Sequence, residues 1–326
     1  TKAYEIQGSL CLGTSLNQLG YDHVFYVKLA SGAVFSSLLS KGNEKIVHRT
    51  INHILLDGPS LRSYRHFPNV GKRKSWAAAD ASKRGIELAK ISQLNDEVYS
   101  SIQNDKNWGF EKNYLNDSEI KFGKELNDWV VQNVLFKVLF PAEFHGQSAV
   151  EGAIKLSKEF NQNIDKVKKI NIFTHEPAIR IIANKENLSN ASDRDHSLEY
   201  MVSAALLFGE LKYEMYGNDF SGLNKIESLR KKIVVSEDTD FTKNYYEFSK
   251  RHISNSIEIV YDNNSTSEKI TIENPIGHPS RREEAIPLLK EKFIRNVQNV
   301  LSLEKSMSLW EQVINLEKDD ELTKFF

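Results

Sequence analysis

Two histidines stand next to helix-forming stretches of this sequence and are candidates for acid–base chemistry. His145 lies in FPAEFHGQSAVEGA (140–153), after an apolar run and before a helical pattern. His196 lies in DRDHSLEYM (193–201), beside Arg194 and before a second helical pattern. An imidazole changes its protonation state near neutral pH, so either ring could move a proton. Either could equally be an ordinary capping or connecting residue, because most histidines are structural or exposed.

The position of His196 favours the neutral form of its ring. A helix dipole repels positive charge at the helix N-terminus, and a neutral imidazole is a usable base. We expect Asp193 or Asp195 to cap this helix by accepting hydrogen bonds from its first-turn amides. That capping role does not explain why Arg194 and His196 stand together.

A basic segment, LRSYRHFPNVGKRKS (61–75), precedes an Ala-rich helical pattern. Its cationic side chains are Arg62, Arg65, His66, Lys72, Arg73 and Lys74. Helix N-termini favour anions, and guanidinium groups bind carboxylates in a bidentate fork. With Ser75 as the expected N-cap, the Lys74 ammonium could reach an anion held at this helix end. The segment predicts a pocket for a substrate with several carboxylates; a solvated basic loop or an RNA-binding patch is the alternative.

Motifs of several other kinds of site are absent. The sequence has no nucleotide-binding glycine loop, zinc-type Cys/His spacing or Gly-x-Ser-x-Gly turn. Its single cysteine, Cys11, excludes an internal disulfide and a Cys-ligated iron–sulfur cluster within the chain. Further histidines at element boundaries are His23, His175 and His278. The pattern indicates metal-independent acid–base chemistry on an anion, with no cofactor.

The bulk composition is that of a globular protein of about two domains. The 326 residues include 44 acidic and 43 basic ones, and the mean hydropathy is −0.46. This balance gives no indication of nucleic acid or an anionic membrane as partner. No apolar stretch approaches the roughly 20 residues of a membrane-spanning helix. Because Thr1 lies within a structured pattern, we expect a leading segment to be missing.

The periodicity predicts a mostly helical α+β fold. Helices are expected at 3–20, 27–42, 43–58, 75–93, 148–162, 196–211 and 280–301, and strands at 168–175, 231–238 and 256–274, the last a hairpin. Small residues inside 27–42 favour close packing against another helix. We predict a large all-helical domain interrupted by a smaller α+β lid domain: 1–139 helical, 140–280 lid, and 281–326 returning to the helical domain.

Several long motifs resemble the MmgE/PrpD family of 2-methylcitrate dehydratases. They are KAYEIQGSL, DGPSLRSYRHFPNVGKRKSWAAADASKRG, NVLFKVLFPAEFHGQSAVEGA, DRDHSLEYMVSAALLFG and ENPIGHPSRREEAIPLLKEKF, in the family's order up to about Val300. The resemblance implies a large helical domain with an α+β lid. It also implies loss of water from 2-methylcitrate to give 2-methyl-cis-aconitate, a step of propionate breakdown, without an iron–sulfur cluster.

The resemblance also suggests site residues. Similarity to the related cis-aconitate decarboxylase implies pocket roles for Lys74, Lys137 and His23, and the family's EFH and DRDH segments contain His145 and His196. We therefore expect these five as catalytic residues, His145 at an interdomain cleft. The expected substrate-binding residues are Arg65, His66, Arg73, Ser75 and Arg194. Which residue is base and which is acid stays open.

Some features depart from the family or leave alternatives. Family members begin earlier, and the preceding segment contributes Asp and His to the site. The chain could thus be a non-catalytic fragment or half of a split enzyme. Ser197 replaces the Cys usual in dehydratases, a small change. Citrate dehydration, cis-aconitate decarboxylation and epimerisation of a dicarboxylate are alternative activities. We expect a homodimer in the cytoplasm, or in the mitochondrial matrix of a eukaryote.

Overall fold

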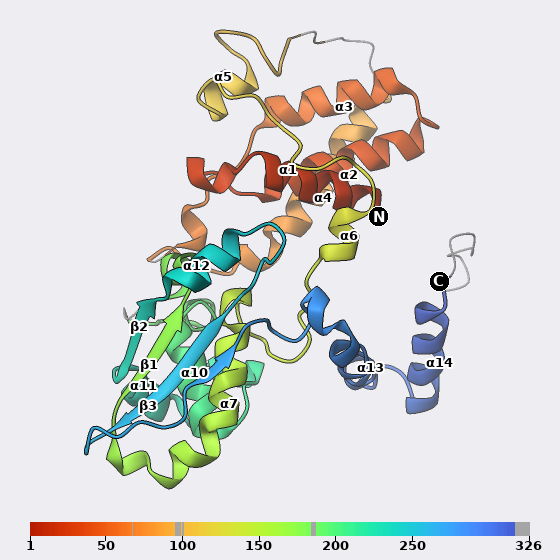
Figure 1. Ribbon diagram of the computed structural model, residues 1–326. Helices are drawn as coiled ribbons and strands as arrows, with labels where there is room; N and C mark the ends of the chain where they lie inside the picture. The colour runs from red at the N-terminus through yellow and green to blue at the C-terminus, as the bar shows by residue number, and fades with distance from the viewer. Residues whose placement is uncertain (67, 95–98, 100, 184–186, 317–326) are drawn as a thin grey trace. The chain divides into compact units, whose positions relative to one another are not determined.

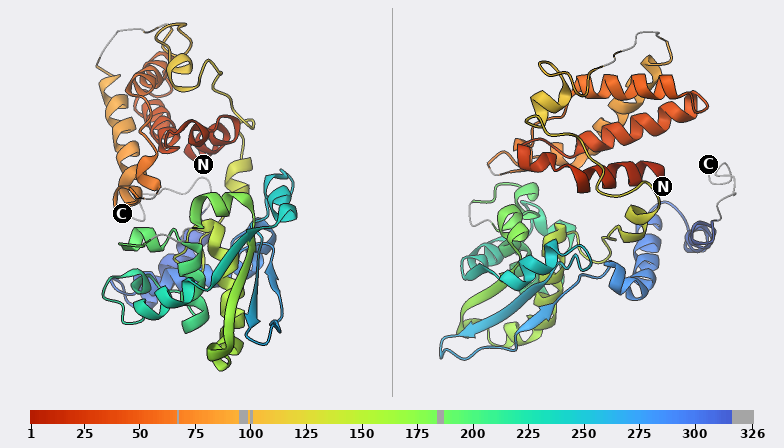
Figure 2. Two further views of the ribbon diagram at one scale, coloured as in Figure 1. Left: turned by 90° about the vertical axis from the view of Figure 1, so that its left-hand side faces the viewer. Right: turned by 45° about the horizontal axis from the view of Figure 1, so that its top comes forward.

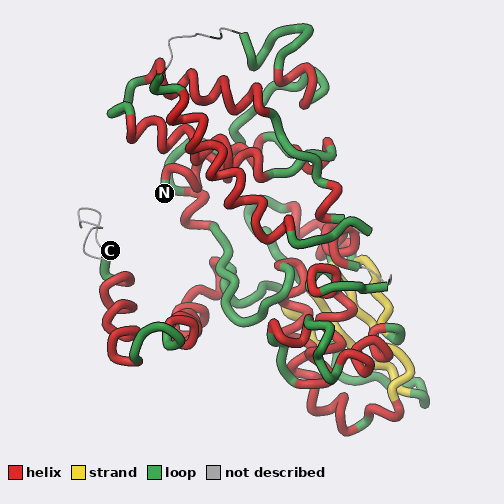
Figure 3. Tube along the Cα trace, turned by 180° about the vertical axis from the view of Figure 1, so that it is seen from behind, coloured by secondary structure: helices red, strands yellow, loops and turns green. Residues whose placement is uncertain are grey.

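The protein divides into two compact units. A computed structural model describes residues 1–66, 68–94, 99, 101–183 and 187–316 (Figure 1). The first unit, Thr1–Val134, is called the helical unit here, and the second, Leu135–Phe326, the sheet unit. The strands among the described residues all belong to the sheet unit, as the yellow segments of Figure 3 show. No described helix is long and apolar enough to cross a membrane.

The helical unit is built around three helices that pack on one another: α2 (Val24–Leu39), α3 (Glu44–Asp57) and α4 (Arg73–Ile91). Its other helices are α1 (Lys2–Gly13), α5 (Phe110–Tyr114) and α6 (Trp129–Asn133). Helix α2 packs closely on α4 because glycines face each other there. A Cβ on Gly85 would lie 2.4 Å from the Lys28 carbonyl oxygen, and one on Gly32 would lie 3.1 Å from the Gly85 oxygen. The close packing predicted from the small residues of 27–42 is confirmed.

The sheet unit contains one mixed four-stranded sheet. Its strands are β1 (Val167–Thr174), β2 (Ile233–Glu237), β3 (Asn255–Tyr261) and β4 (Ile270–Ile272), in the spatial order β2-β1-β3-β4. β1 and β2 are parallel, and β3 pairs antiparallel with β1 and β4. The helices are α7 (Gln147–Gln162), α8 (Glu176–Ile182), α9 (Ala191–Arg194), α10 (Leu198–Phe208), α11 (Leu223–Arg230), α12 (Thr239–Tyr246), α13 (Arg282–Val297) and α14 (Leu303–Ile314).

One face of the sheet carries the main core. Ile170 and Ile172 of β1 and Ile257 and Ile259 of β3 are fully buried. The two residues of each strand lie on the same face of the sheet, because alternate residues of a strand point to the same side. They pack with α7 and with α10, whose residues 198–206 are buried all round. The left view of Figure 2 shows strands on one side of this unit and helices on the other. This core fixes the strand ends that carry the candidate site.

The fold class and the other predicted helices and strands are confirmed, but the helix expected at 3–20 ends at Gly13 and is followed by a separate 3-10 helix, Leu16–Leu19. The capping predictions were also wrong. Ser75 lies inside α4, which begins at Arg73 with Lys72 at the N-cap. Neither Asp193 nor Asp195 caps α10; its cap is Ser197, whose side chain accepts from the Tyr200 amide. The cause is a short extra helix, α9, which contains Asp193 and has Asp195 at its C-cap.

The boundary between the two compact units falls after Val134. The predicted boundary at 139 and 140 lies a few residues later. The structure groups α13 and α14 with the sheet unit. Their predicted return to the helical domain stays a prediction.

Candidate functional site

Glu143 fixes the backbone and the ring of His145. Both residues lie at a short 3-10 helix, Phe144–Gly146, that leads into α7. The Glu143 carboxylate accepts from the His145 amide at 2.8 Å, and its two oxygens lie 2.9 and 3.0 Å from His145 Nδ1. A carboxylate only accepts hydrogen bonds, so Nδ1 carries a proton. In the neutral ring the lone pair is therefore on Nε2.

Two aromatic rings meet the other side of His145. Its Nε2 lies 3.2 Å from the Tyr245 hydroxyl, which is carried by α12. His175 stacks on Tyr245 with 4.8 Å between ring centroids and an interplanar angle of 12°. His175 is fully buried; its Nδ1 lies 3.3 Å from the Ser254 carbonyl oxygen. Its Nε2 has no hydrogen-bond partner within the described part of the chain. We call Glu143, His145, His175 and Tyr245 the His145 cluster.

Burial and charge set the protonation states of the cluster. Burial raises the pKa of Glu143, but the hydrogen bonds and charge of His145, with a contribution from His196, outweigh it and lower the pKa to about 2. Burial, followed by the nearby charge of His145, lowers the pKa of His175 to about 4. Burial chiefly raises the pKa of the Tyr245 hydroxyl. Near neutral pH, Glu143 is an anion, His175 is neutral and Tyr245 keeps its proton.

The cluster sits at one end of the sheet. His175 follows β1 and is the N-cap of α8, and α12 follows β2. Both helices therefore begin at the same end of the parallel strand pair. Asn255 begins β3 at that end, and its Nδ2 donates to the His145 carbonyl oxygen at 2.9 Å. Figure 1 shows α12 at this end of the sheet. Rigid strand ends thus position residues from four separate segments of the sequence.

Two sequence-predicted histidines influence the Glu143 carboxylate. His145 contacts its carboxylate, and the charge of His196 contributes to the lowered pKa of that carboxylate. His196 Nδ1 lies 2.7 Å from Asp195 Oδ1, and the His196 side chain is 23 % exposed. It precedes the N-cap of α10 by one residue rather than lying in the first turn.

Arg194 has a different place in the sheet unit. It is buried, and its Nη1 donates at 2.7 Å to both the Tyr216 carbonyl oxygen and Asn218 Oδ1. The guanidinium therefore holds the loop after α10.

Lys137 is exposed, and its carbonyl oxygen accepts from Lys292 Nζ at 2.5 Å.

In the helical unit, the basic segment folds around a buried carboxylate. Asp22 is fully buried and accepts from Arg65 Nε at 2.7 Å and from the Tyr64 hydroxyl. His23 Nδ1 lies 3.3 Å from Asp22 Oδ1, and burial chiefly lowers the pKa of His23. Arg65 is thus neutralised within the protein. The pair fixes the segment that leads to α4.

The remaining predicted residues of this segment lie around the start of α4. Lys74 is half-buried in its first turn. The Ser75 hydroxyl donates to the Lys72 carbonyl oxygen at 2.7 Å. Exposed His66 accepts from Arg62 Nε at 3.1 Å. The Arg73 guanidinium lies over the rings of Tyr64 and Trp76, at 5.2 and 4.6 Å from their centroids.

A cleft of about 240 Å³ lies between α2 and α4, next to Arg73. Its wall includes the buried Lys28, whose Nζ donates to Asp57 Oδ2 at 2.7 Å, and Arg84, which binds the same carboxylate. Sequence patterns did not single out this trio. The cleft places Arg73 beside a polar cavity of the helical unit, whereas the His145 cluster belongs to the sheet unit.

Three members of the His145 cluster were missed by the sequence analysis. Glu143 lay within the segment 140–153 without a predicted role, and His175 was named only as a further histidine at an element boundary. Tyr245 gave no signal, because it lies 100 residues after His145 in a polar helix.

No group of three or more His, Cys, Asp or Glu side chains able to hold a metal ion occurs among the described residues.

Comparisons with known proteins agree with this architecture. The model of the MmgE/PrpD N-terminal domain matches residues 1–123, and that of the C-terminal domain matches residues 140–318. The chain is 41 % identical over 299 residues to 2-methylcitrate dehydratase of Salmonella typhimurium and to that of Escherichia coli K12. These alignments cover 91 % of this chain and 62 % of each relative.

A eukaryotic relative matches over almost the whole chain. The mitochondrial 2-methylcitrate dehydratase of Yarrowia lipolytica is 40 % identical over 326 residues, covering 98 % of this chain and 62 % of the relative. The chain thus spans about three fifths of the length of these relatives. With both domain models matched in order, the chain belongs to the MmgE/PrpD family.

Proposed function

We propose that the protein is a hydro-lyase that converts 2-methylcitrate to 2-methyl-cis-aconitate and water. The observation that carries this proposal is the 40–41 % identity, through both family domains, to proteins named 2-methylcitrate dehydratase. The His145 cluster supports it with a group suited to the chemistry. Elimination needs a base for a proton alpha to a carboxylate and an acid for the leaving hydroxyl.

His145 is the base in this proposal. Glu143 holds its Nδ1 proton, so Nε2 has the lone pair that would accept the substrate proton. The carboxylate also stabilises the imidazolium that forms, because an adjacent negative charge favours the charged ring. Its own pKa of about 2 keeps Glu143 ionised throughout. General base catalysis by such a residue typically contributes about 10²–10⁴-fold to the rate.

Cationic groups would hold the substrate carboxylates and make its alpha proton easier to remove. We place Lys74, Lys137 and Arg73 in this role. His66 and Ser75 complete the anion-binding segment, and His23 and His196 are further acid–base candidates. Arg65 and Arg194 already donate to groups of the protein, so we assign them to positioning the site. The reaction proposed needs no metal ion or cofactor.

The preferred substrate is 2-methylcitrate rather than citrate. One methyl group in an apolar contact is worth only about 1 kcal/mol, so citrate would remain a slower substrate. Comparable kcat/KM values for the two substrates would remove this preference. Decarboxylation of cis-aconitate is the family activity that a product analysis would distinguish, because it releases carbon dioxide.

The proposed setting completes this proposal. We place the reaction in propionate breakdown, with a homodimer as the working form and neither nucleic acid nor membrane as partner. The cytoplasm is the expected compartment, or the mitochondrial matrix in a eukaryote, as the name of the Yarrowia relative states for that protein.

A direct assay tests the proposal. Purified protein is mixed with 2-methylcitrate, with and without a chelator, and the absorbance of the unsaturated product is followed. We expect turnover that the chelator does not change. Absence of product from 2-methylcitrate would overturn the assigned reaction. Activity lost to the chelator and restored by iron would overturn the metal-independent mechanism.

A further inference from the structure

The Tyr245 hydroxyl is hydrogen-bonded to Nε2 of His145, the ring nitrogen that acts as base in the proposed mechanism. Nε2 of His145 is the acceptor of the pair because Nδ1 already donates to Glu143. The Tyr245 hydroxyl, 3.2 Å away, is therefore the donor. Burial raises the pKa of this hydroxyl, so the proton remains on Tyr245 near neutral pH. The Nε2 atom of His145 and the protonated Tyr245 hydroxyl thus face each other across one hydrogen bond.

The ring of Tyr245 is held in place from two sides. His175 stacks on it, and Tyr246 meets it edge-on with 5.2 Å between centroids and an interplanar angle of 85°. His175 is itself fully buried behind the stack. Because burial keeps His175 neutral, it adds no second positive charge when His145 accepts a proton. The hydroxyl position is consequently preorganised, as a catalytic proton donor requires.

We propose that Tyr245 is the acid of the reaction and protonates the leaving hydroxyl, in an inference that rests on the proposed dehydration. His145 Nε2 takes the proton alpha to the carboxylate, and the C–H electron pair becomes the second bond of the alkene. The C–O bond breaks with its electron pair on oxygen, which receives the Tyr245 proton and leaves as water. The imidazolium then returns its proton to the phenolate across their hydrogen bond, and both groups regain their starting states.

The spacing of the two groups suits this cycle. The proton and the hydroxyl of the substrate are carried by neighbouring carbon atoms, so base and acid must lie within a few ångströms of each other. His145 Nε2 and the Tyr245 oxygen satisfy that condition. The same hydrogen bond gives a direct route for resetting the site. No co-reactant is needed, because His145 takes up one proton and Tyr245 gives up one proton in each cycle.

Tyr245→Phe tests the role, with Tyr246→Phe as a matched control on the same helix. Phenylalanine keeps the stacking surface and removes only the hydroxyl. Tyr246 is 54 % exposed, and its hydroxyl donates to Glu176 rather than to the His145 cluster. We expect Tyr245→Phe to lower kcat by about 10²–10⁴-fold with little change in KM. Tyr246→Phe should retain wild-type kcat, and both variants should keep the wild-type unfolding midpoint.

A pH profile and a substrate-independent spectrum complete the experiment. Wild-type kcat should fall at high pH as Tyr245 loses its proton, and Tyr245→Phe should lose that limb. In histidine-labelled protein, the ¹⁵N resonance of His145 Nε2 should move in Tyr245→Phe and stay fixed in Tyr246→Phe. An active wild type with Tyr245→Phe within threefold of its kcat would overturn the acid role alone. A wild type with no turnover of 2-methylcitrate would overturn the proposed function itself.

Discussion

At the scale of single residues, the two histidines of the cluster behave in opposite ways. The His145 side chain is 15 % exposed, and its Nδ1 lies 2.9 Å from a carboxylate oxygen of Glu143. His175 is fully buried, and its pKa is lowered to about 4. The first can therefore accept a proton during a reaction, whereas the second is kept neutral. This difference makes protein stability depend on pH in a predictable direction.

Stability should fall as the pH is lowered from 6.5 towards 4.5, in part because of His175. The unfolded chain protonates this residue near pH 6.5, but the folded chain does so only near pH 4. In this window the unfolded state binds more protons, so protonation favours unfolding. The gap between the two values corresponds to at most about 3 kcal/mol, reached below pH 4. Urea unfolding at several pH values measures the effect.

The matched variant is His175→Phe, which keeps a ring against Tyr245 and cannot titrate. Its unfolding free energy should vary less between pH 6.5 and 4.5 than that of the wild type. His23 and His278, whose pKa values are also lowered, contribute equally to both proteins. Glu143 begins to contribute about one pH unit above 4.5, its pKa in the unfolded chain, and both proteins contain this residue. Equal pH dependence of the two proteins would contradict the assigned state of His175.

Residue patterns predicted part of this site. His145 and His196 were found because each histidine stands beside a helical pattern and next to other polar residues. Tyr245 could not be found, since nothing in KNYYEF (243–248) distinguishes it from its exposed neighbour Tyr246. Only the fold, which brings α12 to the end of β1, reveals that its hydroxyl meets His145. Local spacing carries no information about such a long-range pair.

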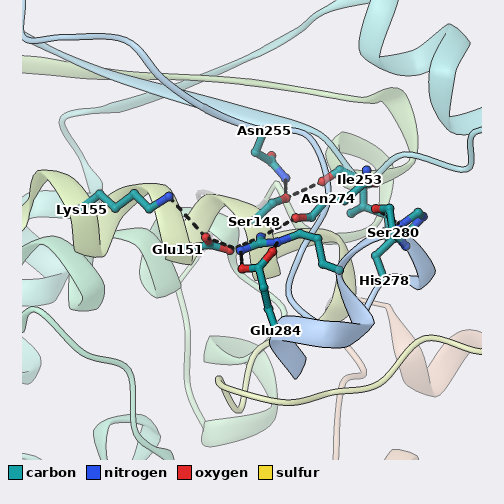
Figure 4. A network of polar contacts seen from close by, with 10 residues as sticks. Ser148, Glu151, Lys155, Ile253, Asn255, Asn274, His278, Ser280 and Glu284 are labelled. Carbon is teal, nitrogen blue, oxygen red and sulfur yellow. Dashed lines mark hydrogen bonds and ion pairs between the residues drawn. The ribbon is translucent and has the colours of Figure 1, made fainter. Parts of the chain in front are cut away.

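At the scale of elements, Arg281 joins the start of α13 to the body of the sheet unit. Its guanidinium donates to both Glu151 oxygens at 2.9 and 3.2 Å, to Glu284 at 2.8 and 3.0 Å, and to the Asn274 carbonyl oxygen at 2.8 Å. Figure 4 shows Glu151, Glu284 and Asn274 converging, with Lys155 approaching Glu151 from the same helix, α7. Glu151 is 8 % exposed, so its charge needs a partner.

Arg281→Ala should destabilise the sheet unit by about 3 kcal/mol, because it leaves the Glu151 carboxylate poorly paired in a buried site. The matched control is Glu284→Ala, since the Glu284 side chain is 56 % exposed. Its loss should cost less than about 1 kcal/mol. Urea unfolding of the three proteins measures the difference. Similar small losses in both variants would show that Arg281 does not anchor α13.

Periodicity predicted elements better than it predicted their ends. The helices at 43–58 and 148–162 and the strand at 168–175 match α3, α7 and β1 within a few residues. An element can be recognised in the sequence because its apolar residues must face the core. The prediction of Ser75 as N-cap was wrong because the N-cap of α4 is Lys72, three residues earlier, and local propensity does not fix where a helix begins.

At the scale of the whole molecule, the sequence and the structure both divide the chain into a helical part and a part that contains a sheet. The predicted boundary at residues 139 and 140 lies in the apolar run before His145, and the compact units separate after Val134. The end of a compact unit depends on long-range contacts, which a local sequence pattern does not show. The predicted cleft between domains stays a prediction.

The central claim is that His145 is the base of a dehydration reaction, and His145→Asn tests it most directly. Asparagine keeps a polar side chain beside Glu143 but cannot accept the substrate proton. His48→Asn, at an exposed position of α3, is the control. We expect kcat for 2-methylcitrate to fall by at least about 10²-fold in His145→Asn and to stay at the wild-type value in His48→Asn. A folded His145→Asn protein whose kcat remains within a few-fold of wild type would contradict the claim.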